Sequence, residues 1–129
     1  MTPKKPAPKP SPTILLVDDE PDFLAGVREV LEAAGYSVIT APDLRSGREA
    51  LKTKNLALAI LDVNLPDGEG YELMNELRRS GSTLPVLFLT VRNEMKDILK
   101  GIAEGGRDYL TKPFGKAELL AAIHRVLAA

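Results

Sequence analysis

The chain has 129 residues, of which 44% are hydrophobic and 27% charged, and its formal net charge is −1. These values fit one soluble globular domain, and the nearly balanced charge gives no global field that would attract nucleic acid or an anionic membrane. Cysteine is absent, which excludes disulfides, thiolate metal sites and cysteine nucleophiles. No apolar stretch approaches the ~20 residues of a membrane span, and no signal-peptide pattern follows the early lysines, so we expect a cytoplasmic location.

Residues 1–12 contain five of the ten prolines and no large apolar side chain except Met1. Because such a segment has few backbone donors and little to bury, we expect an extended, solvated tail. The spacing Pro3-Lys4-Lys5-Pro6 also matches a PxxP docking motif, but proline-rich tails produce this spacing by chance. The globular domain is therefore expected over residues 13–129.

From residue 13 onward, strand-like and helix-like segments alternate. An apolar strand over 13–17 precedes a helix that begins at Pro21, a residue suited to a first helical turn, and ends at Gly35. A second strand over 36–40 is followed by a helix that Asp43 caps and that runs to about residue 53. The third strand, over 56–61, is apolar throughout, as is typical of a central parallel strand covered on both faces.

The second half of the chain continues this alternation. Apolar residues at helical spacing between 71 and 77 indicate a third helix, and an apolar run over 84–89 indicates a fourth strand. A fourth helix is marked by apolar residues from Met95 to Ile102 and ends at Gly105-Gly106, before a strand over 109–111 and a last helix with its apolar positions between 119 and 127. Five β-α repeats with short connections predict a doubly wound α/β fold, a parallel sheet with helices on both faces.

Polar residues follow these strands at the points where the strands end. In open α/β folds the carboxyl ends of parallel strands meet at the edge where ligands bind. We therefore expect three carboxylates, one hydroxyl and one ammonium group to meet there, from Asp18, Asp19, Asp62, Thr90 and Lys112.

Each of these residues also has a simpler interpretation. The acids Asp18, Asp19 and Glu20 precede a helix, where carboxylates cap free N–H groups and interact favourably with the helix dipole. Asp62 alone would suit a turn, Thr90 would simply end a strand, and Lys112 would be one more surface lysine. Pro113, which follows Lys112, makes a cis peptide bond possible there. The set as a whole is more specific than any one of its members.

Carboxylate oxygens without His or Cys select a hard cation, so Mg²⁺ is the natural candidate and Mn²⁺ the alternative. A divalent ion would remove the repulsion among the acids and polarise a phosphoryl group, so that a neighbouring carboxylate attacks phosphorus. Thr90 and Lys112 would then neutralise the phosphoryl oxygens.

At this point the sequence resembles a known family. Residues 13–128 are similar to the receiver domain of two-component response regulators, both the chemotaxis regulator and the DNA-binding regulators. The resemblance implies a flavodoxin-like sheet with strand order 2-1-3-4-5. It rests on the stretches Ile14–Glu20, Leu61–Gly70, Phe88–Thr90 and Asp108–Phe114, which occur in the family's order and spacing.

The resemblance also implies a role for each residue. Asp62 would be the phosphoacceptor, taking a phosphoryl group from a histidine kinase or a histidine phosphotransfer protein. Asp19 and Asp62 would bind Mg²⁺ directly, the backbone carbonyl of Asn64 would be a third ligand, and Asp18 would hold a metal-bound water.

The switch implied by the resemblance starts at Thr90, which would close onto the phosphoryl oxygens while Lys112 pairs with them. Tyr109 would then turn inward, and the surface formed by the fourth helix, the fifth strand and the fifth helix would change to control a protein target or output domain. The chain would be no enzyme beyond its own Mg²⁺-dependent phosphorylation and dephosphorylation. It would bind no nucleic acid or membrane itself, and would be a monomer or a phosphorylation-dependent dimer.

Four residues depart from the family pattern or stand outside it. Val91 follows Thr90 where the family mostly has a small residue, and we hypothesise slower transfer or a longer-lived acyl phosphate. Arg107 lies where DNA-binding relatives are often acidic, which puts their mode of dimerisation in doubt. Glu69 replaces a frequent Asp and is expected to be neutral, whereas His124 on the last helix is expected to be a surface or packing residue.

Three other interpretations remain to be weighed. A phosphatase of the haloacid dehalogenase type would have its nucleophile early in the chain with a second Asp two residues later, but here the acid pair comes first and residue 64 is Asn. A degenerate receiver used only as a scaffold would have lost Asp62, one of the acids or Lys112. A flavodoxin-like cofactor carrier would need a phosphate-cradling loop where Asp18-Asp19-Glu20 stands, and these acids repel a phosphate unless a cation intervenes.

Overall fold

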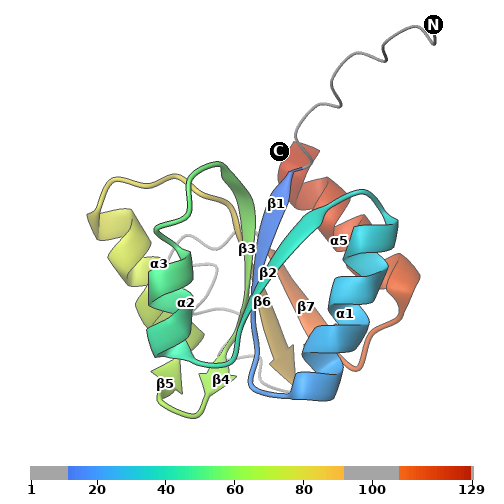
Figure 1. Cartoon of the computed structure of the whole chain (residues 1–129), viewed down its shortest axis with the longest axis horizontal. Coiled ribbons are helices and arrows are strands. Elements are labelled where there is room, and N and C mark those ends of the chain that lie inside the picture. Colours follow the sequence, from blue (N-terminus) through green and yellow to red (C-terminus); the bar gives the residue numbers. More distant parts are fainter. Residues whose placement is uncertain (1–11, 92–107, 129) are drawn as a thin grey trace, which may run out of the picture.

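Five parallel strands form the centre of the structure, a computed structural model that describes residues 12–91 and 108–128 (Figure 1). The elements in chain order are β1 (Thr13–Val17), α1 (Pro21–Ala33), β2 (Ser37–Ala41), α2 (Leu44–Ala50), β3 (Leu56–Asp62), β4 (Asn64–Leu65), β5 (Gly68–Glu69), α3 (Gly70–Arg79), β6 (Val86–Val91), β7 (Asp108–Lys112) and α5 (Lys116–Ala128).

The large sheet has the order β2-β1-β3-β6-β7, and every neighbouring pair in it is parallel. Counted along the chain, these five strands follow the order 2-1-3-4-5, so the predicted topology is confirmed. Helices α1 and α5 cover one face of the sheet, and α2 and α3 cover the other (Figure 1). This strand order makes β1 and β3 neighbours, so their carboxyl ends lie beside each other at the point where the direction of the chain across the sheet reverses.

The sheet divides the core into two halves because successive side chains of a strand point to opposite faces. In β1, Ile14 and Leu16 pack in the half beneath α1 and α5, whereas Leu15 and Val17 pack in the half beneath α2 and α3. All four side chains are fully buried. Burial on both faces explains why β1 and β3 are apolar without alternation, as the sequence indicated.

Helix boundaries follow the predicted signals, with one error. Pro21 is the first residue of α1, and Gly35 lies just past its end with φ of 99°, a conformation that glycine adopts without strain. Asp43 caps α2 through its Oδ1, which accepts a 2.8 Å hydrogen bond from the Ser46 N–H. However, α2 ends at Ala50 and not near residue 53. The amides of Lys52 and Thr53 bond three positions back, which tightens the chain into turns.

A short antiparallel hairpin, β4 paired with β5, was not predicted from the sequence. The carboxylate of Asp67 also accepts hydrogen bonds from the backbone N–H groups of Leu44, at 2.8 Å, and Arg45, at 3.2 Å. These are the first two residues of α2, whose N–H groups have no partner within the helix. Asp67 therefore fastens the loop after β3 to the N-terminus of α2.

Three predictions fall outside the described residues: the tail up to residue 11, the fourth helix from Met95 to Gly106, and the comparison at Arg107. Pro12, the last residue of the predicted tail, accepts a 2.9 Å hydrogen bond from the Ser37 N–H through its carbonyl. In the described ranges, each helix is too short or too polar to cross a membrane.

Candidate functional site

The carboxyl edge of the sheet brings together polar side chains that are buried. Asp18 directly follows β1 and is 0% exposed, while Asp62 is the last residue of β3 and is 7% exposed. Thr90 lies in β6 and is 2% exposed, and Lys112 ends β7. The strands end later than the sequence suggested, by one residue at β3 and β7 and by two residues at β6. Asp62, Thr90 and Lys112 therefore belong to the strands themselves and are positioned by their hydrogen-bond ladder.

Lys112 connects two of the acids directly. Its Nζ lies 2.6 Å from Asp18 Oδ2 and 3.2 Å from Asp62 Oδ2, and donates a hydrogen bond to each. The peptide bond between Lys112 and Pro113 is cis. Lys112 is therefore no ordinary surface lysine, because its ammonium group is held between two buried carboxylates 94 and 50 residues away in the chain.

The second oxygen of each acid is held by the backbone. Asp18 Oδ1 accepts a hydrogen bond from the Glu20 N–H at 3.0 Å, and Asp62 Oδ1 accepts one from the Asn64 N–H at 3.1 Å. Glu20, which precedes α1, makes no side-chain capping hydrogen bond. Helix capping therefore does not account for the acidic triplet, and both buried carboxylates are fixed in orientation.

The acids form a group that suits a metal ion. Carboxylate oxygens of Asp18, Asp19 and Asp62 lie within 4.8 Å of one another, and Asp19 is the exposed member. Among the described residues, these three carboxylates face the ammonium group of Lys112 alone, so this part of the cluster carries excess negative charge. An all-oxygen donor set with this charge fits a hard divalent cation such as Mg²⁺.

Burial changes the proton affinity of Asp62. Desolvation raises the pKa of this carboxyl group from 3.8 to about 6, and repulsion from Asp18 adds to the increase, while Lys112 and the Asn64 N–H oppose it. Burial alone would lower the pKa of Lys112, but its hydrogen bonds and attraction to Asp18 and Asp62 outweigh this and raise that pKa. The carboxylate of Asp62 is thus the one that gains most from an added positive charge.

The two residues predicted to act as a switch lie at the same edge but apart from the cluster. The Thr90 hydroxyl donates a long hydrogen bond, 3.4 Å, to the Val91 carbonyl, and within the described ranges it makes none to Asp62. Tyr109 is 37% exposed, and Val91, which pairs with Lys112 in the strand register, is 45% exposed. Both large side chains therefore face outward in this structure.

Two residues of the site were missed by sequence reasoning. Lys112 Nζ lies 4.4 Å from the centroid of the Phe23 ring, a cation–π distance, and Phe23 in turn makes an edge-to-face contact with Phe114 at 5.8 Å between centroids. Phe23 was assigned only to the core because of its helical spacing. Its place in the first turn after the acid pair was the available signal.

Gly70 is the other residue that was missed. A methyl group at this position would collide with the backbone carbonyl oxygen of Asp62, and the Gly70 N–H donates to the Val63 carbonyl at 2.9 Å. Glycine therefore lets the N-terminus of α3 approach the chain directly behind Asp62. A glycine at the start of a predicted helix, which is a poor helix former, was the signal in the sequence.

Among the remaining predicted residues, Asn64 lies beside Asp62 through its backbone N–H, and its role as a metal ligand stays a prediction. His124 is exposed on α5, which confirms it as a surface residue.

Comparison with known proteins agrees with this geometry. Residues 14–124 match the family model described as the response regulator receiver domain. The chain is 37% identical over 114 residues to the transcriptional regulatory protein RprY of Bacteroides fragilis, covering 88% of this chain and 48% of the relative. It is 41% identical over 117 residues to the alkaline phosphatase synthesis transcriptional regulatory protein PhoP of Bacillus subtilis, with 88% and 48% covered. The chain thus spans about half the length of the curated relatives it matches.

Solved structures give the same result. The chemotaxis protein CheY4 of Vibrio cholerae superposes with a TM-score of 0.83 at 33% identity, covering 91% of this chain and 99% of that one. A response regulator from Chloroflexus aurantiacus superposes with a TM-score of 0.85 at 32% identity, covering 92% and 99%. The fold, the buried acid–lysine cluster and these matches together assign the chain to the receiver domain family of two-component response regulators, which are switches activated by phosphorylation.

Proposed function

We propose that Asp62 is the phosphoacceptor of this receiver domain and takes its phosphoryl group from a phosphohistidine of a histidine kinase or phosphotransfer protein. The observation that carries the proposal is the contact of Lys112 Nζ with both Asp18 and Asp62 inside a group of three carboxylates. A structural ion pair would need one carboxylate, not three. Asp62 is the member at the end of the central strand β3, and burial raises its pKa.

The reaction is a displacement at phosphorus. A carboxylate oxygen of Asp62 forms the new P–O bond, the P–N bond to the donor imidazole breaks, and its electron pair leaves with the imidazole. Lys112 Nζ, already 3.2 Å from Asp62 Oδ2, pairs with the phosphoryl oxygens, and the Thr90 hydroxyl donates to another. In hydrolysis, a water oxygen forms the new P–O bond, the P–O bond to Asp62 breaks, and the carboxylate leaves with the electron pair while a proton of the water passes to solvent.

The side chains of Asp18, Asp19 and Asp62 and the carbonyl of Asn64 would hold Mg²⁺, or Mn²⁺ in its place. The ion supplies positive charge that polarises the phosphoryl group and offsets the added charge of roughly −1.5 to −2 on phosphorylation. In the chain itself, the Asn64 and Glu20 N–H groups keep Asp62 and Asp18 oriented while the charge of the site changes.

The output of the switch begins at Thr90. Movement of its hydroxyl toward the phosphoryl group leaves space that the ring of Tyr109, now 37% exposed, fills. The surface of β7 and α5, together with the segment between β6 and β7, then changes and controls a protein partner or an output domain. We further propose that the chain acts in the cytoplasm, catalyses only its own phosphorylation and dephosphorylation, and binds neither nucleic acid nor membrane directly.

The test is the intact mass of the chain after incubation with acetyl phosphate, with Mg²⁺ and with EDTA, alongside Asp62→Asn. We expect one phosphoryl adduct that needs Mg²⁺ and is absent from the variant. Asp67→Asn is the matched control, because it removes a nearby carboxylate outside the cluster and should leave the adduct unchanged. Without an adduct from either acetyl phosphate or a phosphohistidine donor, the scaffold interpretation would replace this proposal.

A further inference from the structure

The side of the molecule formed by α2 and α3 carries a continuous groove away from the acidic cluster. The two helices lie side by side on one face of the sheet (Figure 1). Three adjoining cavities of about 220, 210 and 380 Å³ follow their contact from its middle to the loop before β6. Neighbouring cavities share lining residues: Arg48 and Glu76 line the first two, and Leu51 and Leu77 line the last two.

Leucine side chains form part of the lining of this α2–α3 groove, beside polar groups. Leu51, Leu77, Leu56 and Leu84 are only half-buried and pack on the core half beneath α2 and α3. One wall is held in place by Arg78, whose Nη1 donates to the carbonyls of Ser82 at 3.2 Å and Leu84 at 2.9 Å. The groove is therefore preformed and offers leucine side chains that a second apolar surface would cover.

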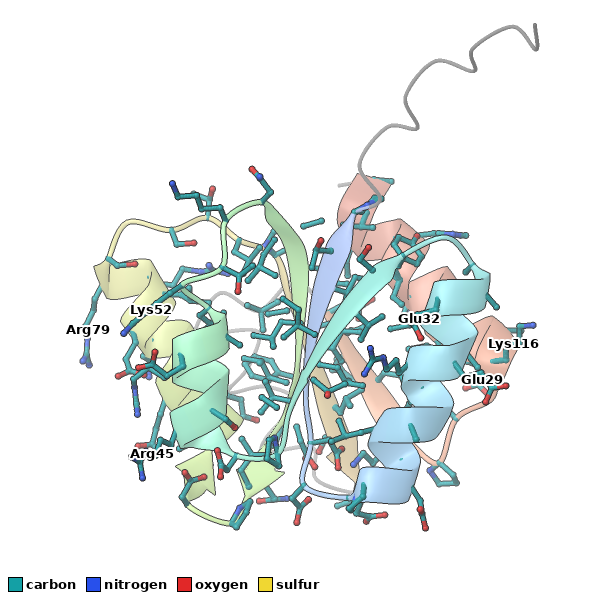
Figure 2. All side chains as sticks on the ribbon, in the orientation of Figure 1. Glu29, Glu32, Arg45, Lys52, Arg79 and Lys116 are labelled. Atoms are coloured by element: carbon teal, nitrogen blue, oxygen red, sulfur yellow. The ribbon has the colours of Figure 1, made fainter. Side chains whose placement is uncertain are left out.

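The rim of the groove is basic. Over residues 44–55 the chain has four basic side chains, Arg45, Arg48, Lys52 and Lys54, against the single acid Glu49, although the whole chain carries −1. Figure 2 shows Arg45, Lys52 and Arg79 projecting outward on this side, whereas Glu29 and Glu32 project from α1 on the opposite side.

Part of this positive charge is not neutralised. Arg48 is paired with Glu76 across the groove at 3.0 Å, and Lys52 with Glu49 at 3.1 Å. Counting only residues that the structure describes, Arg45, Lys54 and Arg79 form no salt bridge. The N–H groups at the start of α2 already bind Asp43 and Asp67, so the anion-binding capacity lies in the side chains and not at the helix terminus.

We propose that the α2–α3 groove binds an acidic amphipathic helix of a partner protein. Aliphatic side chains of that helix, spaced i, i+3, i+4 and i+7, cover Leu51 and Leu77, and its flanking carboxylates pair with Arg45, Lys52 and Arg79. A nucleic acid fits less well, because its phosphates and sugars would leave the leucine side chains of the groove uncovered. The site shares no residue with the cluster around Asp62 and does not depend on the proposed phosphorylation.

The probe is a synthetic 14-residue peptide with leucines at helical spacing and glutamates on both flanks, titrated into the isotope-labelled chain and followed by backbone amide NMR shifts. We expect saturable shifts confined to α2, α3 and the loop before β6, and weaker binding at high salt. A peptide of the same composition in scrambled order is the first control, since it keeps the charge and loses the apolar stripe. Equal binding of the scrambled peptide, or shifts centred elsewhere, would overturn the proposal.

Variants locate the site. Lys52→Glu combined with Arg79→Glu removes two exposed ion pairs with the glutamates of the bound peptide and should weaken binding about tenfold. The matched reversal on the other flank, Arg28→Glu combined with Lys116→Glu, should leave binding unchanged. Ser80→Trp fills the groove from an exposed position without removing a core contact, and should abolish binding at an unchanged Tm.

Other occupants give distinct results in the same experiment. A single-stranded oligonucleotide that displaces the peptide and binds more tightly would replace the proposal with a nucleic-acid site. Groove shifts that appear on raising the concentration of the chain alone would identify a second copy as the occupant. Either result would contradict a docking site for an acidic helix.

Discussion

The carboxyl edge of the sheet and the α2–α3 groove both contain a basic side chain paired with a carboxylate, yet their surroundings differ. The Lys112 and Asp18 side chains are 19% and 0% exposed, whereas those of Arg48 and Glu76 are 47% and 43% exposed. In the first pair water is largely excluded, so charge interactions are strong and unpaired charge is costly. In the second, water screens both groups, and the pair contributes little to stability.

The stoichiometry of the two regions differs as well. Arg48 meets one carboxylate and the pair is neutral, but Lys112 meets Asp18 and Asp62 with Asp19 nearby. A buried cluster with surplus negative charge is less stable alone than with a bound cation. The stability of such a cluster therefore responds to an added charge, and a switch requires this response. Burial, together with the excess of carboxylates over basic groups, distinguishes the signalling site from an ordinary pair of surface charges.

The largest effect is expected for Lys112→Met. This change leaves Asp18 buried without its partner, and in EDTA it should lower the free energy of unfolding by about 3 kcal/mol, the lower end of the range for a broken buried pair, because Asp62 can take up a proton. Urea unfolding monitored by circular dichroism measures the difference. If Lys112→Met lowered the free energy of unfolding no more than Arg48→Met, burial would not explain a difference in strength between the two ion pairs.

A pH effect is expected from Asp62. Its pKa is about 6 in the folded chain against an ordinary 3.8, so the folded state holds this proton more tightly than the unfolded state. The stability from this group is therefore fully present at low pH and is lost as pH rises from about 4 to about 6. In EDTA, Asp62→Asn should gain stability relative to the unmodified chain over that range, as measured by urea unfolding at several pH values. A constant difference between the two proteins would contradict the raised pKa.

A smaller effect is expected for Val91→Ala. Val91 is the register partner of Lys112, and our hypothesis is that its branched side chain limits the approach of water and donors to the site. Removing it should shorten the lifetime of the acyl phosphate several-fold, as measured by the decay of the phosphorylated mass in Mg²⁺. An unchanged decay rate would show that Val91 does not crowd the site.

The smallest effect is expected for Arg48→Met. Because both members of its pair are nearly half exposed, the free energy of unfolding should change by less than about 0.5 kcal/mol. Urea unfolding under the conditions used for Lys112→Met makes the comparison direct. The phosphoryl adduct should also form at the same rate, because Arg48 lies away from the acidic cluster.

Sequence patterns were sufficient for the sheet, because buried parallel strands are continuous apolar runs and their ends carry the polar residues. They identified Asp18, Asp62 and Lys112, which the structure brings within hydrogen-bonding distance. The helix end at residue 53 was wrong because the amides of Lys52 and Thr53, which follow α2, bond three positions back, a local geometry that composition does not reveal.

Contacts between distant segments were beyond sequence reasoning. Phe23 looked like any core position of an amphipathic helix, and only the approach of Lys112, at the end of β7, to the first turn of α1 puts its ammonium group over this ring. Gly70 and Asp67 likewise depend on how closely α3 and α2 approach the loop after β3. Periodicity reports which face of an element is buried, but not which neighbour covers it.

Asp67 gives the two regions a common support. It belongs to the hairpin loop that follows Asp62, and its carboxylate holds the first N–H groups of α2, a helix that forms one side of the groove. If phosphorylation shifts this loop, the groove changes with it, and the coupling is reciprocal by thermodynamic necessity. A peptide that binds the phosphorylated chain more tightly must then favour the phosphorylated form by the same factor. A docking partner would therefore increase the fraction of the chain that is phosphorylated.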